Sequence, residues 1–320
     1  MRAAAIGTAA ILAPVMASAA IDPPVVKATV SQTPGNYVNP PVPRFLERLP
    51  PLPSGHVVAV KLVLLDETVR ISNTMRYRAW TFNGTIPGPV IHARVGDRID
   101  VTLTNRAPMG HSIDFHAALA PPNVAYQSIG PGQTLRFSWV AQYPGAFVYH
   151  CGTPPVLAHI SNGMYGAIII DPPGDTPPAQ SFVFVQSEFY PTLVPGTTDE
   201  YAGDMKKMEG VFAEVVLFNG RSFQYMEHPL AIRVRQPVRV YVVDAGPSHF
   251  SAFHVIGTLF ARAMQDGNPK NVQYGIQTMT IPPGGGAIGE FTVYQPGHYP
   301  FVTHQFGDAD HGAMGAFEAK

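Results

Sequence analysis

The sequence predicts an all-β protein built from two tandem Greek-key β-sandwich domains. Charged residues make up only 13% of the 320 residues, while 33 prolines and 30 glycines provide for many turns. Short alternating apolar segments recur from residue 56 onward, separated by turn signals such as FNGTIPGP (82–89). The second half of the chain also repeats motifs of the first half. Together these observations are typical of a duplicated sandwich.

The N-terminal 20 residues have the organisation of a secretory signal peptide. Arg2 supplies a positive charge, an apolar run follows, and Ala17-Ser18-Ala19 forms a small-residue cleavage site. The apolar run is too short and too rich in alanine for a good membrane span, and no other stretch approaches spanning length. We therefore expect an exported, periplasmic protein with no membrane span.

Composition divides the rest of the chain into four parts. Residues 21–55 are rich in proline and predict an extended N-terminal arm. Residues 56–171 predict the first sandwich domain, residues 172–180 a linker rich in proline, and residues 181–320 the second domain. The formal net charge of −1 gives no electrostatic case for binding nucleic acid or a membrane surface.

The repeat is clearest at the histidine motifs. HSIDFH (111–116) is answered by HFSAFH (249–254), with the same spacing between histidines, and GMYGA (163–167) is answered by GAMGA (312–316). Self-similarity of this quality indicates two copies of one fold.

The segment PGAFVYHCGTPPVLAHISNGM (144–164) predicts a copper site. It contains the only cysteine of the chain, Cys151, together with His159 and Met164. A thiolate, an imidazole and a thioether suit copper that cycles between Cu(I) and Cu(II). The second imidazole can come from His111, because strand alternation allows His111 and Cys151 both to point into the first domain.

The same alternation predicts a second histidine cluster on the opposite face. His150 is adjacent to Cys151 and therefore points the other way. His116 is separated from His111 by an odd spacing and shares the outward face with His150. Asp114 has the same parity as His116.

Two imidazoles are too few for a tightly bound catalytic metal, which usually has three protein ligands and an open position. The candidates for the third ligand are His254 and His304, at the positions equivalent to His116 and His150. The second domain itself cannot build a thiolate site, because Gln305 stands where the first domain has its cysteine. A metal that draws a ligand from each domain lies at a domain interface, within one chain or between chains.

Four motifs together resemble those of copper-containing nitrite reductases: HSIDFH, FVYHCGTPPVLAHISNGMYG, SAFHVIG and FVTHQFGDADHGAMG. The resemblance covers residues 56–320. It implies a homotrimer of subunits with two cupredoxin-like domains, each subunit carrying one type 1 and one type 2 copper. It also implies the one-electron reduction of nitrite to nitric oxide in denitrification, with electrons from a small periplasmic donor, a c-type cytochrome or a cupredoxin.

The resemblance also assigns roles by position. It implies that Asp114 and His254 are the catalytic pair and that Ile256 is the apolar residue crowding the substrate pocket. The implied type 1 ligands are His111, Cys151, His159 and Met164, and the implied type 2 ligands are His116, His150 and, from the neighbouring subunit, His304.

Two other classes of copper protein are alternatives. A small multicopper oxidase would need H-x-H pairs and an H-C-H motif, but the chain has no H-x-H, and Gly152 follows Cys151. A type 1 copper electron carrier would need only the buried site, and would leave the duplication and the second histidine cluster unexplained. His249 occupies the position of His111 without a cysteine partner, so we expect a surface or interface polar group there.

Overall fold

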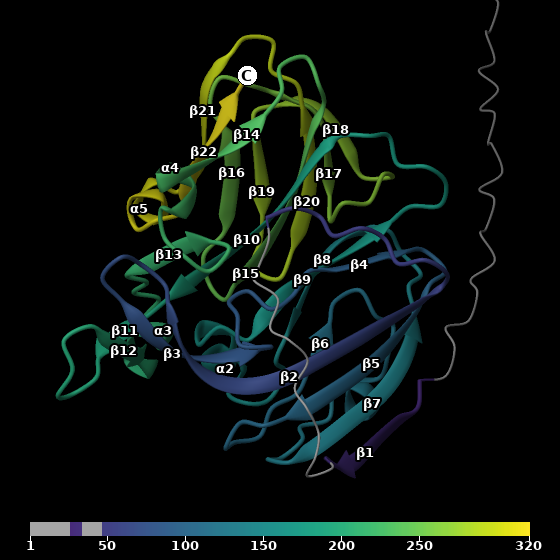
Figure 1. The fold of residues 1–320 in the computed structure, drawn as a ribbon, viewed down its shortest axis with the longest axis vertical. Helices are drawn as coiled ribbons and strands as arrows, with labels where there is room; N and C mark the ends of the chain where they lie inside the picture. Colours follow the sequence, from purple (N-terminus) through teal and green to yellow (C-terminus); the bar gives the residue numbers. More distant parts are fainter. Residues whose placement is uncertain (1–25, 34–46) are drawn as a thin grey trace, which may run out of the picture.

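The computed structural model describes residues 26–33 and 47–320, and it confirms an all-β protein made of two sandwiches. In Figure 1 the second half of the chain forms the upper part and the first half the lower part. The predicted signal peptide (1–20) lies outside the described residues, and so does most of the predicted arm. Of that arm, β1 (Ala28–Gln32) pairs antiparallel with β7 (Gln133–Val140) of the first sandwich.

The first sandwich consists of a seven-stranded and a four-stranded sheet. Their strand orders are β1-β7-β5-β2-β3-β12-β11 and β4-β9-β8-β6. The further strands are β2 (Val57–Arg70), β3 (Arg76–Phe82), β4 (Ile91–Arg94), β5 (Arg98–Asn105), β6 (Asp114–Phe115), β8 (Gly145–His150), β9 (Tyr165–Asp171), β11 (Pro191–Leu193) and β12 (Glu200–Gly203). The last two come from later in the chain and extend the sheet beyond β3.

The second sandwich has a six-stranded sheet, β13-β10-β15-β20-β17-β18, and a five-stranded sheet, β14-β22-β21-β16-β19. Its strands are β10 (Gln180–Phe189), β13 (Val215–Phe218), β14 (His228–Ile232), β15 (Val238–Gly246), β16 (Ser251–Val255), β17 (Phe260–Gln265), β18 (Val272–Ile276), β19 (Thr278–Ile281), β20 (Gly286–Phe291), β21 (Gly297–Thr303) and β22 (Met314–Ala319).

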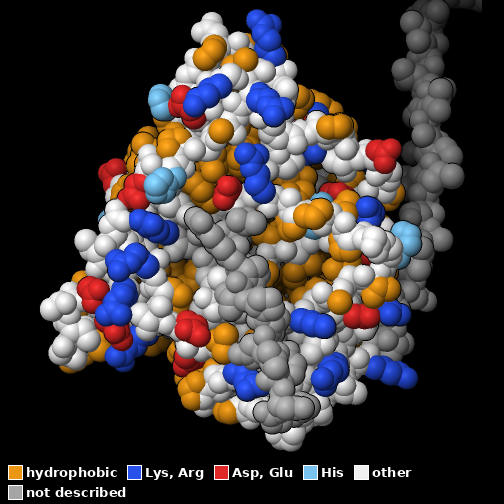
Figure 2. Space-filling model, in the orientation of Figure 1, with side chains coloured by type: hydrophobic (Ala, Val, Ile, Leu, Met, Phe, Trp, Pro, Cys, Tyr) orange, Lys and Arg blue, Asp and Glu red, His pale blue; other side chains and the backbone are white. Residues whose placement is uncertain are grey.

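Short helices lie in the connections: α1 (Pro122–Ala125), α2 (Val156–Ser161), α3 (Met205–Glu209), α4 (Gln224–Glu227) and α5 (Phe306–Asp310). None of the helices in the described part of the chain is long and apolar enough to cross a membrane. On the face shown in Figure 2, positive and negative side chains are interspersed, in keeping with the formal net charge of −1.

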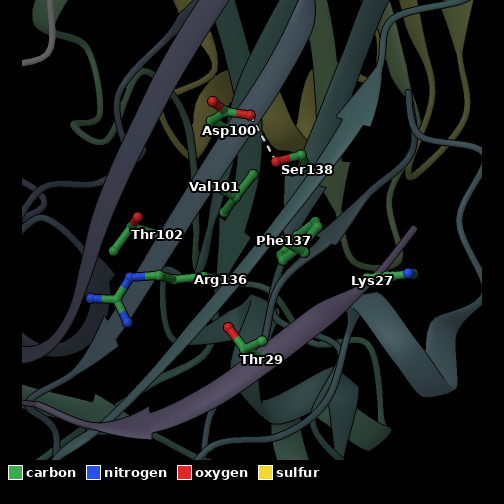
Figure 3. Close-up of a pocket in the computed structure, with 8 residues that line it drawn as sticks. All are labelled: Lys27, Thr29, Asp100, Val101, Thr102, Arg136, Phe137 and Ser138. Atoms are coloured by element: carbon green, nitrogen blue, oxygen red, sulfur yellow. Dashed lines mark hydrogen bonds between the residues drawn. The ribbon is translucent and has the colours of Figure 1, made fainter. Parts of the chain in front are cut away.

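Alternation along the strands of the first sandwich separates a core face from an outer face. Ile99 and Val101 of β5 lie opposite Trp139 and Phe137 of β7, and all four side chains are buried. The outer face of β1, β5 and β7 forms a shallow groove, where Ser138 donates a hydrogen bond of 2.7 Å to Asp100 (Figure 3). None of the predicted site residues lines this groove.

The two halves of the chain share a buried apolar cluster. Val148 and Ile169 of the first half are fully buried with Val183 and Val243 of the second. The backbone of β8 is also tied directly to the second half, since the Ala146 amide donates to the Asp266 carbonyl at 2.9 Å. Strand β8, which ends in His150, is therefore held in place by both domains.

Candidate metal centres

The first cluster lies inside the first sandwich, at the end of β8. Cys151 and His111 are fully buried, and His159 is nearly so. The Cys151 Sγ lies 3.2 Å from Nδ1 of His159 and 4.0 Å from Nδ1 of His111, and the two nitrogens are 3.0 Å apart. The structure therefore brings three of the four predicted ligands of this site to one point, where they could hold a metal ion.

The fourth residue, Met164, is held close to the others by its backbone. Its amide donates to the carbonyl of His159 at 3.1 Å, and its carbonyl accepts from the amide of Cys151 at 3.0 Å. His159 lies in the short helix α2, within the segment that connects Cys151 to Met164. The Met164 side chain is fully buried in the same apolar cluster as Cys151.

The electrostatics of this pocket suit a soft cation. The pKa of His111 is lowered to about 4 by burial and by the neighbouring His159 ring, and burial lowers the pKa of His159 to about 4 as well. Both rings are therefore neutral near pH 7, each with a lone pair available for a metal. The Ser112 amide donates to Sγ of Cys151 at 3.3 Å, which stabilises a thiolate. Two neutral imidazoles and a stabilised thiolate fit copper.

The second cluster lies on the opposite face of the same strand. Strands β6 and β8 pair antiparallel, with Asp114 opposite His150. His116 follows β6 and points to the same side, so that its Nε2 lies 2.9 Å from Nε2 of His150. The Asp114 carboxylate joins the two rings in a group that could hold a metal ion. The predicted opposition of His150 and Cys151 thus corresponds to two clusters on the two faces of one strand.

The hydrogen bonds of the two rings show why a cation fits between them. Nδ1 of His116 lies 3.0 Å from the Gly284 carbonyl, and Nδ1 of His150 lies 2.9 Å from the Cys151 carbonyl. A carbonyl oxygen can only accept, so both Nδ1 atoms carry the proton and both Nε2 lone pairs face each other. Burial lowers the pKa of His150, which opposes an additional proton in the gap. A metal ion can satisfy both lone pairs.

The two candidate third ligands lie in the second domain. His254 is on β16 and His304 follows β21, with ring centroids 5.6 Å apart. Neither joins the Asp114–His116–His150 cluster of its own chain. They repeat the arrangement of His116 and His150, whose centroids are 4.9 Å apart.

Exposed apolar side chains surround His254 and His304. Ile256, the predicted pocket residue, is 43% exposed, and Phe306 is 55% exposed with its ring 4.8 Å from that of His304. His304 is itself exposed. The second-domain histidines thus sit on an accessible, partly apolar surface.

Sequence reasoning missed three contributors to the clusters. The Trp80 ring packs 4.9 Å from that of His159 and 5.9 Å from that of His111. The amide of Ser112 and the carbonyl of Gly284 are backbone groups, which no residue pattern identifies. In the sequence, the one feature that could have pointed to Ser112 is its position directly after the predicted ligand His111.

Comparisons with known proteins agree with this geometry. A family model described as multicopper oxidase matches residues 65–175. A copper-containing nitrite reductase from Neisseria gonorrhoeae is 36% identical over 269 residues, covering 82% of this chain and 68% of the relative. The solved copper nitrite reductase from Nitrosomonas europaea is 35% identical with a TM-score of 0.76, covering 82% of this chain and 94% of that one. A copper-containing nitrite reductase from Thermus scotoductus is 30% identical, also with a TM-score of 0.76, and covers 82% and 62%.

Proposed function

The chain belongs to the copper-containing nitrite reductase family, and on that premise we propose that it reduces nitrite to nitric oxide at the Asp114–His116–His150 cluster. The observation that carries the proposal is the back-to-back arrangement of the two clusters. A thiolate-containing site suited to electron transfer and an open histidine site are joined by the single peptide bond between His150 and Cys151.

We assign the two clusters separate roles. The buried cluster, His111, Cys151, His159 and Met164, is the type 1 copper site and receives single electrons. The outer cluster is the type 2 site, with His116, His150 and the His304 of a neighbouring subunit as ligands. The covalent path through Cys151 and His150 spans roughly 10–13 Å, from Cα spacing and two opposed side chains. Copper bound at these residues would supply an electron relay in the inner site and a Lewis acid in the outer one.

The residues around the outer site supply the protons. Reduction of nitrite by one electron consumes two protons and yields nitric oxide and water. Asp114 lies in the cluster itself and is placed to hydrogen-bond a bound oxyanion or water. His254 lies beside His304 and outside the outer cluster of its own chain, so it reaches this site from the neighbouring subunit. Its Nδ1 donates to the Gln277 carbonyl at 2.5 Å, which leaves Nε2 available to exchange a proton. Ile256, next to this histidine, provides an apolar wall that limits the space for substrate.

A homotrimer supplies the missing ligand. Within one chain the outer cluster has two imidazoles, while His304 is exposed on another part of the surface beside Phe306. A head-to-tail contact between copies brings that surface to the outer cluster of the next subunit, and a closed ring satisfies every site. The exposed Phe250 and Leu259 add to the apolar area available for such a contact.

The remaining partners follow from the family and from the N-terminal segment. The basic, apolar and small-residue organisation of residues 1–20 supports export to the periplasm. We propose that the electron reaches the type 1 site from a small periplasmic protein, a c-type cytochrome or a cupredoxin, as the family resemblance implies.

The experiment that tests the function combines copper content with product formation. We expect two copper ions per chain and nitrite-dependent release of nitric oxide with a chemical reductant. One copper per chain without nitric oxide would indicate an electron carrier. Reductant-dependent oxygen consumption without nitrite turnover would indicate an oxidase, the activity named by the multicopper oxidase model that matches residues 65–175.

A further inference from the structure

A backbone carbonyl of the second domain contacts a histidine of the first. The Gly284 carbonyl lies 3.0 Å from Nδ1 of His116, and the two residues are 168 positions apart in sequence. Gly284 lies in the short turn between β19 and β20. The turn contributes no side chain to the outer cluster, so the roles assigned above give it no part in the site.

The contact decides which nitrogen of His116 faces the metal site. The carbonyl can only accept, so Nδ1 carries the proton and Nε2 carries the lone pair that faces His150. Without this acceptor an exposed imidazole is free to rotate or to change tautomer. A carbonyl partner on the distal nitrogen is the usual device that orients a metal-binding histidine.

The turn that offers this carbonyl is anchored to the core of the second domain. The Gly284 amide donates to the carbonyl of Asp244 at 2.8 Å, and the Asp244 amide donates back to Gly285 at 3.0 Å. Asp244 is fully buried near the end of β15. The position of the acceptor is therefore set by the fold of the second domain, and not by a mobile side chain.

Two features favour glycine at this position. Its φ of +80° is one that residues with a Cβ adopt at a cost. A Cβ there would also lie 3.1 Å from Cε1 of His116, so the ring would have to shift by a few tenths of an ångström to accept it. A side chain at residue 284 therefore acts on the ligand ring directly.

A second contact between a backbone carbonyl and a histidine Nδ1 occurs at the other end of β19. Residue 277, just before that strand, offers its carbonyl to Nδ1 of His254 at 2.5 Å. The turns that flank one short strand of the second domain thus orient two imidazoles, one from each domain.

We propose that Gly284 is a positioning residue for the type 2 copper: through its carbonyl the second domain fixes the tautomer and the orientation of His116 in the same chain. The inference rests on the proposed function, because it takes the outer cluster as the copper site. The inference adds that the contact between the two domains of one subunit affects the copper affinity of the outer cluster. This effect is separate from that of the ligand contributed by a neighbouring subunit.

The test uses two variants and one control in the full-length chain. Gly284→Ala and Gly284→Asn both place a Cβ against the His116 ring, and asparagine tolerates a positive φ better than alanine. Gly275→Ala is the matched control, since Gly275 has a φ of +67° and no atom within 4 Å of its added Cβ. Copper titration of the depleted protein measures affinity, electron paramagnetic resonance reports the type 2 site, and the visible band reports the type 1 site.

We expect the Gly284 variants to bind type 2 copper roughly 10–100-fold more weakly, with altered hyperfine splitting and an unchanged type 1 band. The Gly275 variant should match the parent protein. Unchanged type 2 affinity and spectrum in both Gly284 variants would overturn the proposal, and so would loss of the type 1 band in both, which would make Gly284 a residue of general folding. If the parent binds two coppers without reducing nitrite, the proposed function fails while this comparison of affinities still decides the inference.

Discussion

Equivalent histidines of the two domains, His111 and His249, differ in charge near neutral pH. In the first domain, His111 and His159 lie beside Cys151 as neutral rings, because burial lowers the pKa of each to about 4. In the second domain His249 stands at the position of His111, and its Nδ1 lies 2.8 Å from the Asp308 carboxylate and 3.4 Å from that of Glu188. These carboxylates, with the Asp308 hydrogen bond as the largest cause, raise the pKa of His249 to about 9.

The same place in the cupredoxin-like fold is thus a candidate metal pocket in the first domain and an ion-pair cluster in the second. The first-domain pocket offers lone pairs and a sulfur atom, and a metal cation would supply its positive charge. The second-domain pocket offers two carboxylates, and the imidazolium of His249 supplies the positive charge from within the chain. We expected His249 to be a surface or interface polar group; it is only half-buried, but it is locked in an ion-pair cluster that takes the place of a metal site.

The largest effect should come from removing the thiolate. Cys151→Ala should abolish the intense visible absorption and reduce nitrite turnover to background, while type 2 copper stays bound, because the outer ligands are unaffected. Gln305→Ala, at the equivalent position of the second domain, is the matched control and should change neither property. Absorbance and copper analysis decide this; a coloured Cys151→Ala protein would contradict the type 1 assignment.

A comparably large effect should come from the second-domain histidine. His304→Ala should lose type 2 copper and turnover but keep its type 1 band, because the third imidazole of the outer site is removed. His311→Ala, which removes another exposed histidine of this region, should bind both coppers.

Mixed subunits test whether His304 acts between chains. Co-expressed His116→Ala and His304→Ala chains at equal ratio should regain type 2 copper at about a quarter of their sites, where an intact His116 meets an intact neighbouring His304 in a closed trimer. If His304 acted within its own chain, the mixture would regain none, which would contradict the intersubunit site.

Removal of the carboxylate should have a smaller effect and should leave copper in place. Asp114→Asn keeps size and polarity but removes the acid, so we expect turnover to fall roughly 100-fold, the scale of general acid–base catalysis. The pH–rate profile should lose one of its apparent pKa values. Glu209→Gln, a change at an exposed carboxylate, is the control. Wild-type turnover in Asp114→Asn would contradict the proton-transfer role, and loss of type 2 copper would make Asp114 structural.

Much of this arrangement could be predicted because it depends on local geometry. Strand alternation alone separates His150 from Cys151, and the internal repeat relates His254 and His304 to their first-domain equivalents. What could not be predicted depends on contacts between distant residues. Glu188 and His249 are 61 residues apart, and the Gly284 carbonyl has no side chain to mark it.

The smallest effect concerns stability and tests the second-domain pocket. The folded pKa of His249, about 9, is above its ordinary value near 6.5, so its charge stabilises the fold fully below pH 6.5. That contribution is lost as the pH rises through about 9. His249→Gln should therefore lower the Tm at pH 6 by roughly 2–4 °C, the shift that about 1 kcal/mol produces in a domain of ordinary size.

At pH 10 the Tm values of His249→Gln and the parent should converge, because the parent has then lost the imidazolium as well. His298→Gln is the control: His298 also faces a carboxylate, Glu318 at 2.8 Å, but its side chain is 71% exposed, so water screens the pair and its removal should change the Tm little. A His249→Gln difference that stays constant from pH 6 to 10 would show that packing, and not the charge of this histidine, stabilises the pocket.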